Sequence, residues 1–220
     1  MRKFARLINA VLRFVFHLLY HQMAWSYDLV AAVVSAGQWQ RWVLSTQPYL
    51  PGPRVLELGH GPGHLQAALL AQGIWVCGID ESVQMGRQAL RRLRRKPLTL
   101  RLARGLVQAL PFPAHSFDQV AATFPTNYIY EAGTLAEIYR VLQPGGLLVV
   151  LPGAVNTGRS LPELLAALIF RVTLHAAAER KPQDYAETIL LPFRRAGFRA
   201  ELREIDLPGS RIFLITARKD

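Results

Sequence analysis

Short apolar runs alternate with amphipathic stretches over most of this chain. Four apolar runs have the length of a strand and cover 54–59, 74–80, 98–104 and 117–123. Apolar residues repeat at helical spacing in three stretches, 64–72, 82–95 and 131–142. A fifth apolar run, 147–151, follows a Pro-Gly-Gly turn. This alternation predicts an α/β domain with a parallel sheet and a ligand site at the carboxyl ends of its strands.

The end of the chain has a different pattern. Residues 200–207 and 211–218 are strand-like, and only Pro208, Gly209 and Ser210 join them. So short a connection allows an antiparallel hairpin but leaves no room for a crossover helix. The sequence therefore predicts a last strand that runs against the others.

Two amphipathic segments precede the first strand. Helical spacing predicts helices over 3–20 and 26–44, and the prolines of 51–53 separate them from the alternating part. Basic residues interrupt the first helix, which is typical neither of a signal peptide nor of a membrane span. We expect the segment 1–45 to pack as helices on a domain formed by 46–220. The alternative is an amphipathic helix that lies on an anionic membrane surface.

A second segment falls outside the alternation. Residues 153–197 are expected to form a helical insertion between the fifth strand and the final hairpin. Ser160 and Glu163 give a capping box, and the helix that would follow is apolar on most sides. Such a helix could cover a ligand pocket as a lid or pack on the domain, and both alternatives stay open.

Composition limits the classes of protein that fit. The 220 residues are 51% hydrophobic, enough for one domain with a full core. Cys77 is the only cysteine, so we expect no disulfide, no metal site and a cytoplasmic location, with peripheral membrane contact as the variant. The net charge of +11 favours anionic partners. Its densest cluster, 91–96, falls at a helix end without interleaved aromatic residues, which argues against nucleic acid.

The first strand leads into a glycine-rich loop. Glu57 is followed by Gly59, Gly61 and Gly63, and a helix is expected directly after them. Glycine permits a sharp turn and leaves no Cβ between backbone and ligand, while a helix amino terminus favours an anionic group. The spacing is neither the G-x-G-x-x-G of a dinucleotide site nor a Walker loop. Asp80 ends the next strand, where an acid can accept both hydroxyls of a ribose.

Glu57 and the three glycines resemble motif I, E-x-G-x-G-x-G, of the class I S-adenosylmethionine-dependent methyltransferases of the small-molecule type (methyltransferase type 11-like). Segments 110–118 and 138–146 resemble the family's motifs before the fourth and fifth strands. The resemblance extends over about residues 50–155. It implies a doubly wound sheet of seven mostly parallel strands, ordered 3-2-1-4-5-7-6 with an antiparallel last strand, and S-adenosylmethionine as the cofactor.

The resemblance also implies which residues hold the cofactor. They lie at the ends of the first four strands and are Glu57, Gly59, His60, Gly61, Gly63, Asp80, Glu81, Gly105, Leu106, Val107, Thr123 and Phe124. The chain departs from the family at Leu106, where the family usually has an acid that binds the adenine amino group. Backbone groups, Gln108 and apolar contacts are then left to hold the ring.

The methyl acceptor is less defined. The apolar character of 153–197 favours a small hydrophobic acceptor such as a quinone or lipid, and the Asn/Asp-Pro-Pro-Tyr/Phe pattern of amino-methylating enzymes is absent. His115, Asn127 and Tyr128 are the candidates for a catalytic group. An RNA or protein methyltransferase, favoured by the charge, is one alternative. A non-catalytic protein of the same fold that binds a partner or membrane surface is another, and the sequence does not define the oligomeric state.

Overall fold

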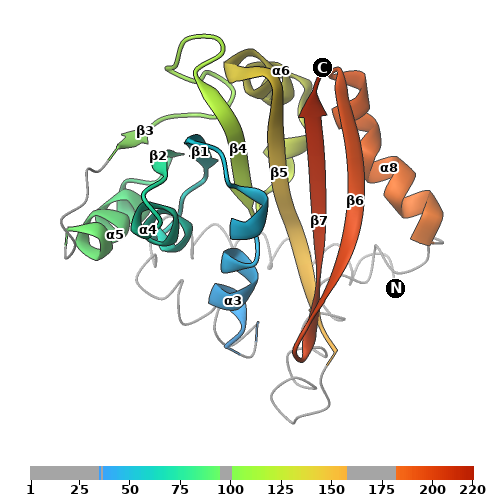
Figure 1. Ribbon diagram of the computed structural model, residues 1–220, viewed down its shortest axis with the longest axis horizontal. Helices are drawn as coiled ribbons and strands as arrows, with labels where there is room; N and C mark the ends of the chain where they lie inside the picture. Colours follow the sequence, from blue (N-terminus) through green and yellow to red (C-terminus); the bar gives the residue numbers. More distant parts are fainter. Residues whose placement is uncertain (1–34, 36, 95–100, 158–181) are drawn as a thin grey trace, which may run out of the picture.

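The protein is built on one twisted sheet (Figure 1). The computed structural model describes residue 35 and residues 37–94, 101–157 and 182–220. Its strands are β1 (Arg54–Leu58), β2 (Trp75–Asp80), β3 (Leu102–Arg104), β4 (Phe117–Thr123), β5 (Leu142–Asn156), β6 (Phe198–Leu207) and β7 (Ser210–Lys219). The seven strands are ordered β3-β2-β1-β4-β5-β7-β6, which confirms the order that the resemblance implied.

Strand direction also follows the expectation. The pairs β1–β2, β1–β4, β2–β3 and β4–β5 are parallel. Strand β7 runs antiparallel to both β5 and β6, and the β6–β7 hairpin extends well beyond the shorter strands in Figure 1. Gly209 allows the tight turn of this hairpin because its φ is +75°, a value that other residues rarely adopt. The predicted reversal of the last strand is confirmed.

Each face of the sheet has its own apolar core. The helices are α3 (Trp39–Leu44), α4 (His64–Ala71), α5 (Val83–Leu93), α6 (Ala132–Val141) and α8 (Pro182–Arg195), with short 3₁₀ turns η2 (Gln47–Tyr49) and η3 (Asn127–Tyr130). Val55 belongs to the cluster that contains Leu65 of α4, whereas Leu56 belongs to the cluster with Ile138 of α6 and Phe193 of α8. Successive strand residues point to opposite faces, and helices cover both, so four of the five residues of β1 are buried.

The predicted helix 26–44 is interrupted at Gly37, and its residues 26–34 lie outside the described residues. The chain turns at Gly37, whose φ is +79°, and α3 begins only at Trp39. A right-handed helix requires negative φ, so the expected continuous helix over 26–44 is wrong at this glycine. The predicted helix 3–20 lies outside the described residues, and the division between 1–45 and the domain stays a prediction. No helix in the described ranges is long and apolar enough to cross a bilayer.

Strand β5 is longer than predicted and shortens the expected insertion. Its residues 153–156 pair with residues 210–213 of β7, the half next to the hairpin turn, because the hairpin extends beyond the other strands. After residues 158–181, which lie outside the described ranges, α8 leads directly into β6, and its Leu190 and Phe193 are buried in the core. Both ends of 153–197 therefore belong to the layers of the sheet. The predicted apolar helix after Ser160 lies outside the described ranges, and so does much of the predicted strand 98–104.

Candidate functional site

The loop after β1 has a backbone that glycine alone adopts without strain. Gly59, Gly61 and Gly63 have φ values of +63°, +51° and +82°. Gly63 also lies close to α5, since a Cβ on it would be 3.0 Å from the Cβ of Ala89. A Cβ on Gly61, in contrast, would meet nothing within 4 Å. The loop is thus held against the protein at Gly63 and faces open space at Gly61.

A hydrogen bond to the Asp80 carboxylate connects this loop to the end of β2. One carboxylate oxygen accepts a hydrogen bond from the Gly61 N–H at 2.9 Å, and the other accepts one from the Ser82 N–H at 2.8 Å. Ser82 in turn caps α5, where its hydroxyl accepts a hydrogen bond from the Met85 N–H. Each carboxylate oxygen has a second lone pair, so Asp80 retains the capacity to accept from a ligand hydroxyl.

Glu57 lies beneath the loop with only 1% of its surface exposed. Its carboxyl accepts a hydrogen bond from the Gln66 side-chain amide at 2.9 Å, and the same amide nitrogen donates to the Cys77 carbonyl at 3.2 Å. Burial raises the pKa of Glu57 to about 8, against a lowering from the Gln66 bond. Glu57 therefore carries a proton at neutral pH. Burial also lowers the pKa of the neighbouring His60.

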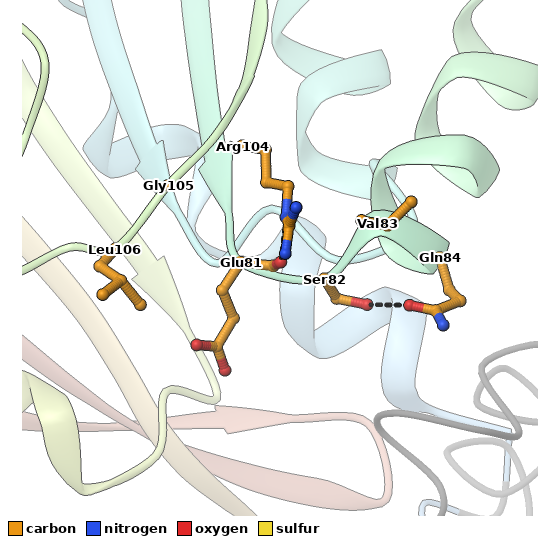
Figure 2. Close-up of a pocket in the computed structure, with 7 residues that line it drawn as sticks. All are labelled: Glu81, Ser82, Val83, Gln84, Arg104, Gly105 and Leu106. Atoms are coloured by element: carbon orange, nitrogen blue, oxygen red, sulfur yellow. Dashed lines mark hydrogen bonds between the residues drawn. The ribbon is translucent and has the colours of Figure 1, made fainter.

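Two hollows lie at this edge of the sheet. The larger has a volume of about 620 Å³ and is lined by Glu81, Ser82, Val83, Gln84, Arg104, Gly105 and Leu106 (Figure 2). The smaller has a volume of about 30 Å³ and is lined by Trp39, Val43, Glu57, Gly59, His60, Gly61, Pro62, His64, Leu65 and Thr123. Asp80 connects them, because Glu81 follows it in the chain and Gly61 bonds to its carboxylate.

The end of β4 contacts helix α3 through aromatic rings. Phe124 follows β4 with φ of +49°, unusual for a residue with a side chain. Its ring stacks on Trp39 of α3 with the centroids 4.0 Å apart, and Trp42 lies 6.1 Å away. Trp39 also lines the smaller hollow. Helix α3 thus places an apolar aromatic wall beside the glycine loop.

The structure brings together most of the predicted cofactor residues. Glu57, Gly59, His60, Gly61 and Thr123 line the smaller hollow, and Glu81, Gly105 and Leu106 line the larger one. Val107 is 8% exposed, and its side chain belongs to the core. Gln108 was expected to help hold the ring, but its amide donates to Glu131 at 3.0 Å.

The three catalytic candidates, His115, Asn127 and Tyr128, do not lie in one place. Tyr128 lies over the glycine loop, since its hydroxyl would be 3.0 Å from a Cβ on Gly59. Asn127 is exposed and begins the turn η3, which also contains Tyr128. His115 lies before β4, at the opposite edge of the sheet, where its Nδ1 is 3.0 Å from the Leu142 carbonyl and 3.4 Å from Lys219 Nζ. His115 therefore belongs to the packing around the chain end and not to this site.

Several residues of the site were not predicted. Trp39 and Gln66 contact the predicted set from α3 and α4, and neither carries a local motif. Their role depends on which helix crosses which strand, so spacing along the chain gives no signal for it. The guanidinium of Arg92, from the basic cluster, donates to the Pro62 carbonyl of the loop. Among the described residues, no group of His, Cys, Asp and Glu could hold a metal ion.

The site occupies a part of the chain that matches a known family. The family described as "Methyltransferase domain" matches residues 55–146, which include β1, the glycine loop, Asp80 and the end of β4. The seven-stranded order and the reversed β7 are those expected for class I. Residues 55–146 of this chain therefore resemble a methyltransferase domain, and the sheet that contains them has the class I strand order.

The chain is similar in sequence to curated quinone methyltransferases. It is 35% identical over 144 residues to a demethylmenaquinone methyltransferase of Symbiobacterium thermophilum, covering 60% of this chain and 57% of the relative. It is 33% identical over 143 residues to a ubiquinone/menaquinone biosynthesis C-methyltransferase of Bordetella parapertussis, covering 60% and 54%. The chain thus matches little more than half the length of these relatives.

A solved structure gives the same picture of the fold. Phosphoethanolamine N-methyltransferase 2 of Haemonchus contortus, in complex with S-adenosyl-L-methionine, superposes with a TM-score of 0.58 at 18% identity. The match covers 83% of this chain and 53% of that one. At this identity the likeness concerns the fold alone.

Proposed function

We propose that this protein transfers the methyl group of S-adenosylmethionine to a small, hydrophobic acceptor such as a quinone. The observation that carries the proposal is the pair of hollows connected by Asp80, at the carboxyl edge of a methyltransferase sheet. Ligands of open α/β sheets bind at this edge. The larger hollow fits a nucleoside in volume, and the smaller one lies next to the aromatic wall at the end of β4.

The residues present fit this cofactor along its length. Gly105 and Leu106 offer backbone and an apolar surface to the adenine, and Asp80 offers its remaining lone pairs to the ribose hydroxyls. The open space over Gly61 admits the ligand against the backbone. Glu57 and Thr123 lie at the far end, where the methionine part would follow.

The cofactor, when bound, supplies an activated methyl group on a sulfonium sulfur. The protein then has to hold the acceptor in line with that group and to exclude water, and alignment of this kind lowers a barrier by up to about 7–11 kcal/mol. Trp39 and Phe124 form an apolar wall suited to a flat acceptor. An acceptor that must lose a proton needs a base within hydrogen-bond reach, and the Tyr128 hydroxyl is the group placed for it.

Supplying the full chain with S-adenosylmethionine labelled in its methyl group tests the proposal. The acceptor panel contains reduced quinones that lack a ring methyl, unsaturated lipids, RNA and protein. We expect label in the quinone fraction, and we expect Tyr128→Phe to lower the rate more than Tyr49→Phe, which changes a tyrosine outside both hollows. Label in RNA or protein alone would support the alternative activity. No label in any fraction would contradict the proposal and favour a non-catalytic role.

A peripheral contact with the membrane is the second part of this proposal. It rests on the basic, amphipathic sequence of 3–20, which lies outside the described residues. A hydrophobic quinone resides in the bilayer, so such a contact would bring the enzyme to its acceptor. We expect co-sedimentation of the full chain with anionic vesicles but not with zwitterionic ones, and less of it after Arg6→Glu and Arg13→Glu. Equal sedimentation with both vesicle types would contradict an electrostatic contact.

A further inference from the structure

The larger hollow has one apolar and one anionic side chain at its opening. Figure 2 shows Glu81, at the end of β2, and Leu106, after β3, projecting toward the same space from two different loops. Glu81 is exposed, and Leu106 is 56% exposed, a large fraction for an apolar residue. Two neighbouring strands thus place a carboxylate and an apolar surface beside each other in a hollow of nucleoside size.

The side chains that line this hollow differ in whether they can accept a hydrogen bond from a ligand. Arg104 has only donors, and its Nε donates to the Glu81 backbone carbonyl at 3.0 Å. The Ser82 hydroxyl is engaged with Gln84 at 3.3 Å and with the backbone of α5. Val83, Gly105 and Leu106 have no polar side chain. The Glu81 carboxylate forms no hydrogen bond or ion pair with any other described residue, and it is therefore the strongest acceptor of the lining that remains available.

We propose that Glu81 selects the base of the cofactor by accepting a hydrogen bond from the 6-amino group of adenine, while the Leu106 side chain covers one face of the ring. This inference rests on the proposed function, since it concerns the same site. A purine has a flat apolar face and a polar edge, and the two side chains match these two features. Within the larger hollow, the Glu81 carboxylate lies on the β2 side and the apolar Leu106 lies on the β3 side.

The consequence is a preference for adenine over bases with an oxygen at position 6. A 6-oxo purine presents an acceptor to the carboxylate, so a favourable charge-assisted hydrogen bond becomes a repulsive contact. Sites that hydrogen-bond a ligand discriminate against analogues that cannot, and bonds to charged groups contribute most. Because Glu81 is exposed to solvent, we expect a preference of about 10–100-fold.

Calorimetric titration of the full chain with S-adenosylhomocysteine and with S-inosylhomocysteine tests this role. The two ligands differ in the 6-substituent and in the proton that the 6-oxo base carries on the adjacent N1. Neither carries the sulfonium, so long-range charge effects cancel in the ratio of their dissociation constants. Wild type is expected to prefer the adenine ligand. Glu81→Gln replaces the carboxylate by an amide that can also donate to a 6-oxo group, and it should reduce the preference to about threefold or less. Glu201→Gln, an exposed glutamate on β6, is the matched control and should leave the preference unchanged.

Three results would overturn the inference. Equal affinity of wild type for both ligands would show that the larger hollow does not distinguish a 6-amino from a 6-oxo purine. An unchanged preference in Glu81→Gln would show that another group makes the distinction. Absence of binding of either ligand by wild type would remove the proposed function itself, and with it the role of Glu81. Binding of S-adenosylhomocysteine without a preference leaves the proposed function intact, so the two failures are distinguishable.

Discussion

The carboxyl group of Glu57 accepts a hydrogen bond from the side-chain amide of Gln66 at 2.9 Å, beneath the glycine loop. Both side chains are 1% exposed, so this is a buried polar pair between β1 and α4. A second contact from the same amide nitrogen, to the Cys77 carbonyl, connects the pair to β2. Three elements that shape the loop are therefore joined by one amide group.

The burial of Glu57 makes stability depend on pH in a defined direction. Its pKa is raised to about 8 in the folded protein, from an ordinary value of 4.5. Between these two values the unfolded chain releases a proton that the folded chain retains, so the free energy of unfolding falls as pH rises. Glu57→Gln lacks this titration. Denaturant unfolding at pH 5 and pH 8 should show wild type losing on the order of a few kcal/mol more than the variant. Parallel losses in both proteins would contradict a protonated Glu57.

Gly63 should tolerate no side chain, although it lies outside both hollows. Gly63→Ala places a Cβ in a left-handed conformation and 3.0 Å from Ala89 of α5, so we expect a loss of about 1–3 kcal/mol in stability. Thermal unfolding of the purified variant measures it.

Gly86→Ala is the control for this prediction. Gly86 lies within α5, has nothing within 4 Å of its added Cβ, and should gain about 0.5–1 kcal/mol from helix propensity. A Gly63→Ala variant as stable as Gly86→Ala would show that the loop does not hold the backbone described here.

Helix α3 is fixed to the final hairpin by a buried hydrogen bond. The Trp42 indole N–H donates to the Ser210 hydroxyl at 2.8 Å, and that hydroxyl donates to Gln38 at 2.9 Å. Trp42→Phe removes the donor and leaves part of the network without a partner, at a cost of about 1–3 kcal/mol. Trp75→Phe changes a tryptophan that is 38% exposed and should cost less. Equal unfolding midpoints for the two variants would contradict the fixing of α3 by this bond.

Much of the fold could be predicted because its signals are local. The glycine loop, the cap at Ser82 and the turn at Gly209 each depend on residues adjacent in the chain. The alternating apolar runs then gave the elements, and the short final turn gave the reversed strand. The conformation of Gly37 is equally local, yet a helical pattern on both sides of it hid the break.

The parts that could not be predicted depend on contacts between distant segments. The stack of Trp39 on Phe124 joins residues that only the folded sheet brings together. The length of β5 depends on β7, and the packing of His115 depends on Lys219 at the chain end. His115 lies within a motif of the resemblance, so the sequence makes it a catalytic candidate. The structure excludes it because it precedes β4 and packs beside Lys219.

Titration of S-adenosylmethionine into the full chain by calorimetry tests the central claim most directly. Asp80→Asn replaces one acceptor oxygen by a donor, so it should weaken binding at least about tenfold, equivalent to ~1.4 kcal/mol. Asp118→Asn, which changes an acid paired with Arg54 at the opposite edge of the sheet, should bind like wild type. We predict saturable binding at one site by wild type and a loss confined to Asp80→Asn. Absence of binding by wild type, or equal binding by Asp80→Asn, would contradict a cofactor site built around Asp80.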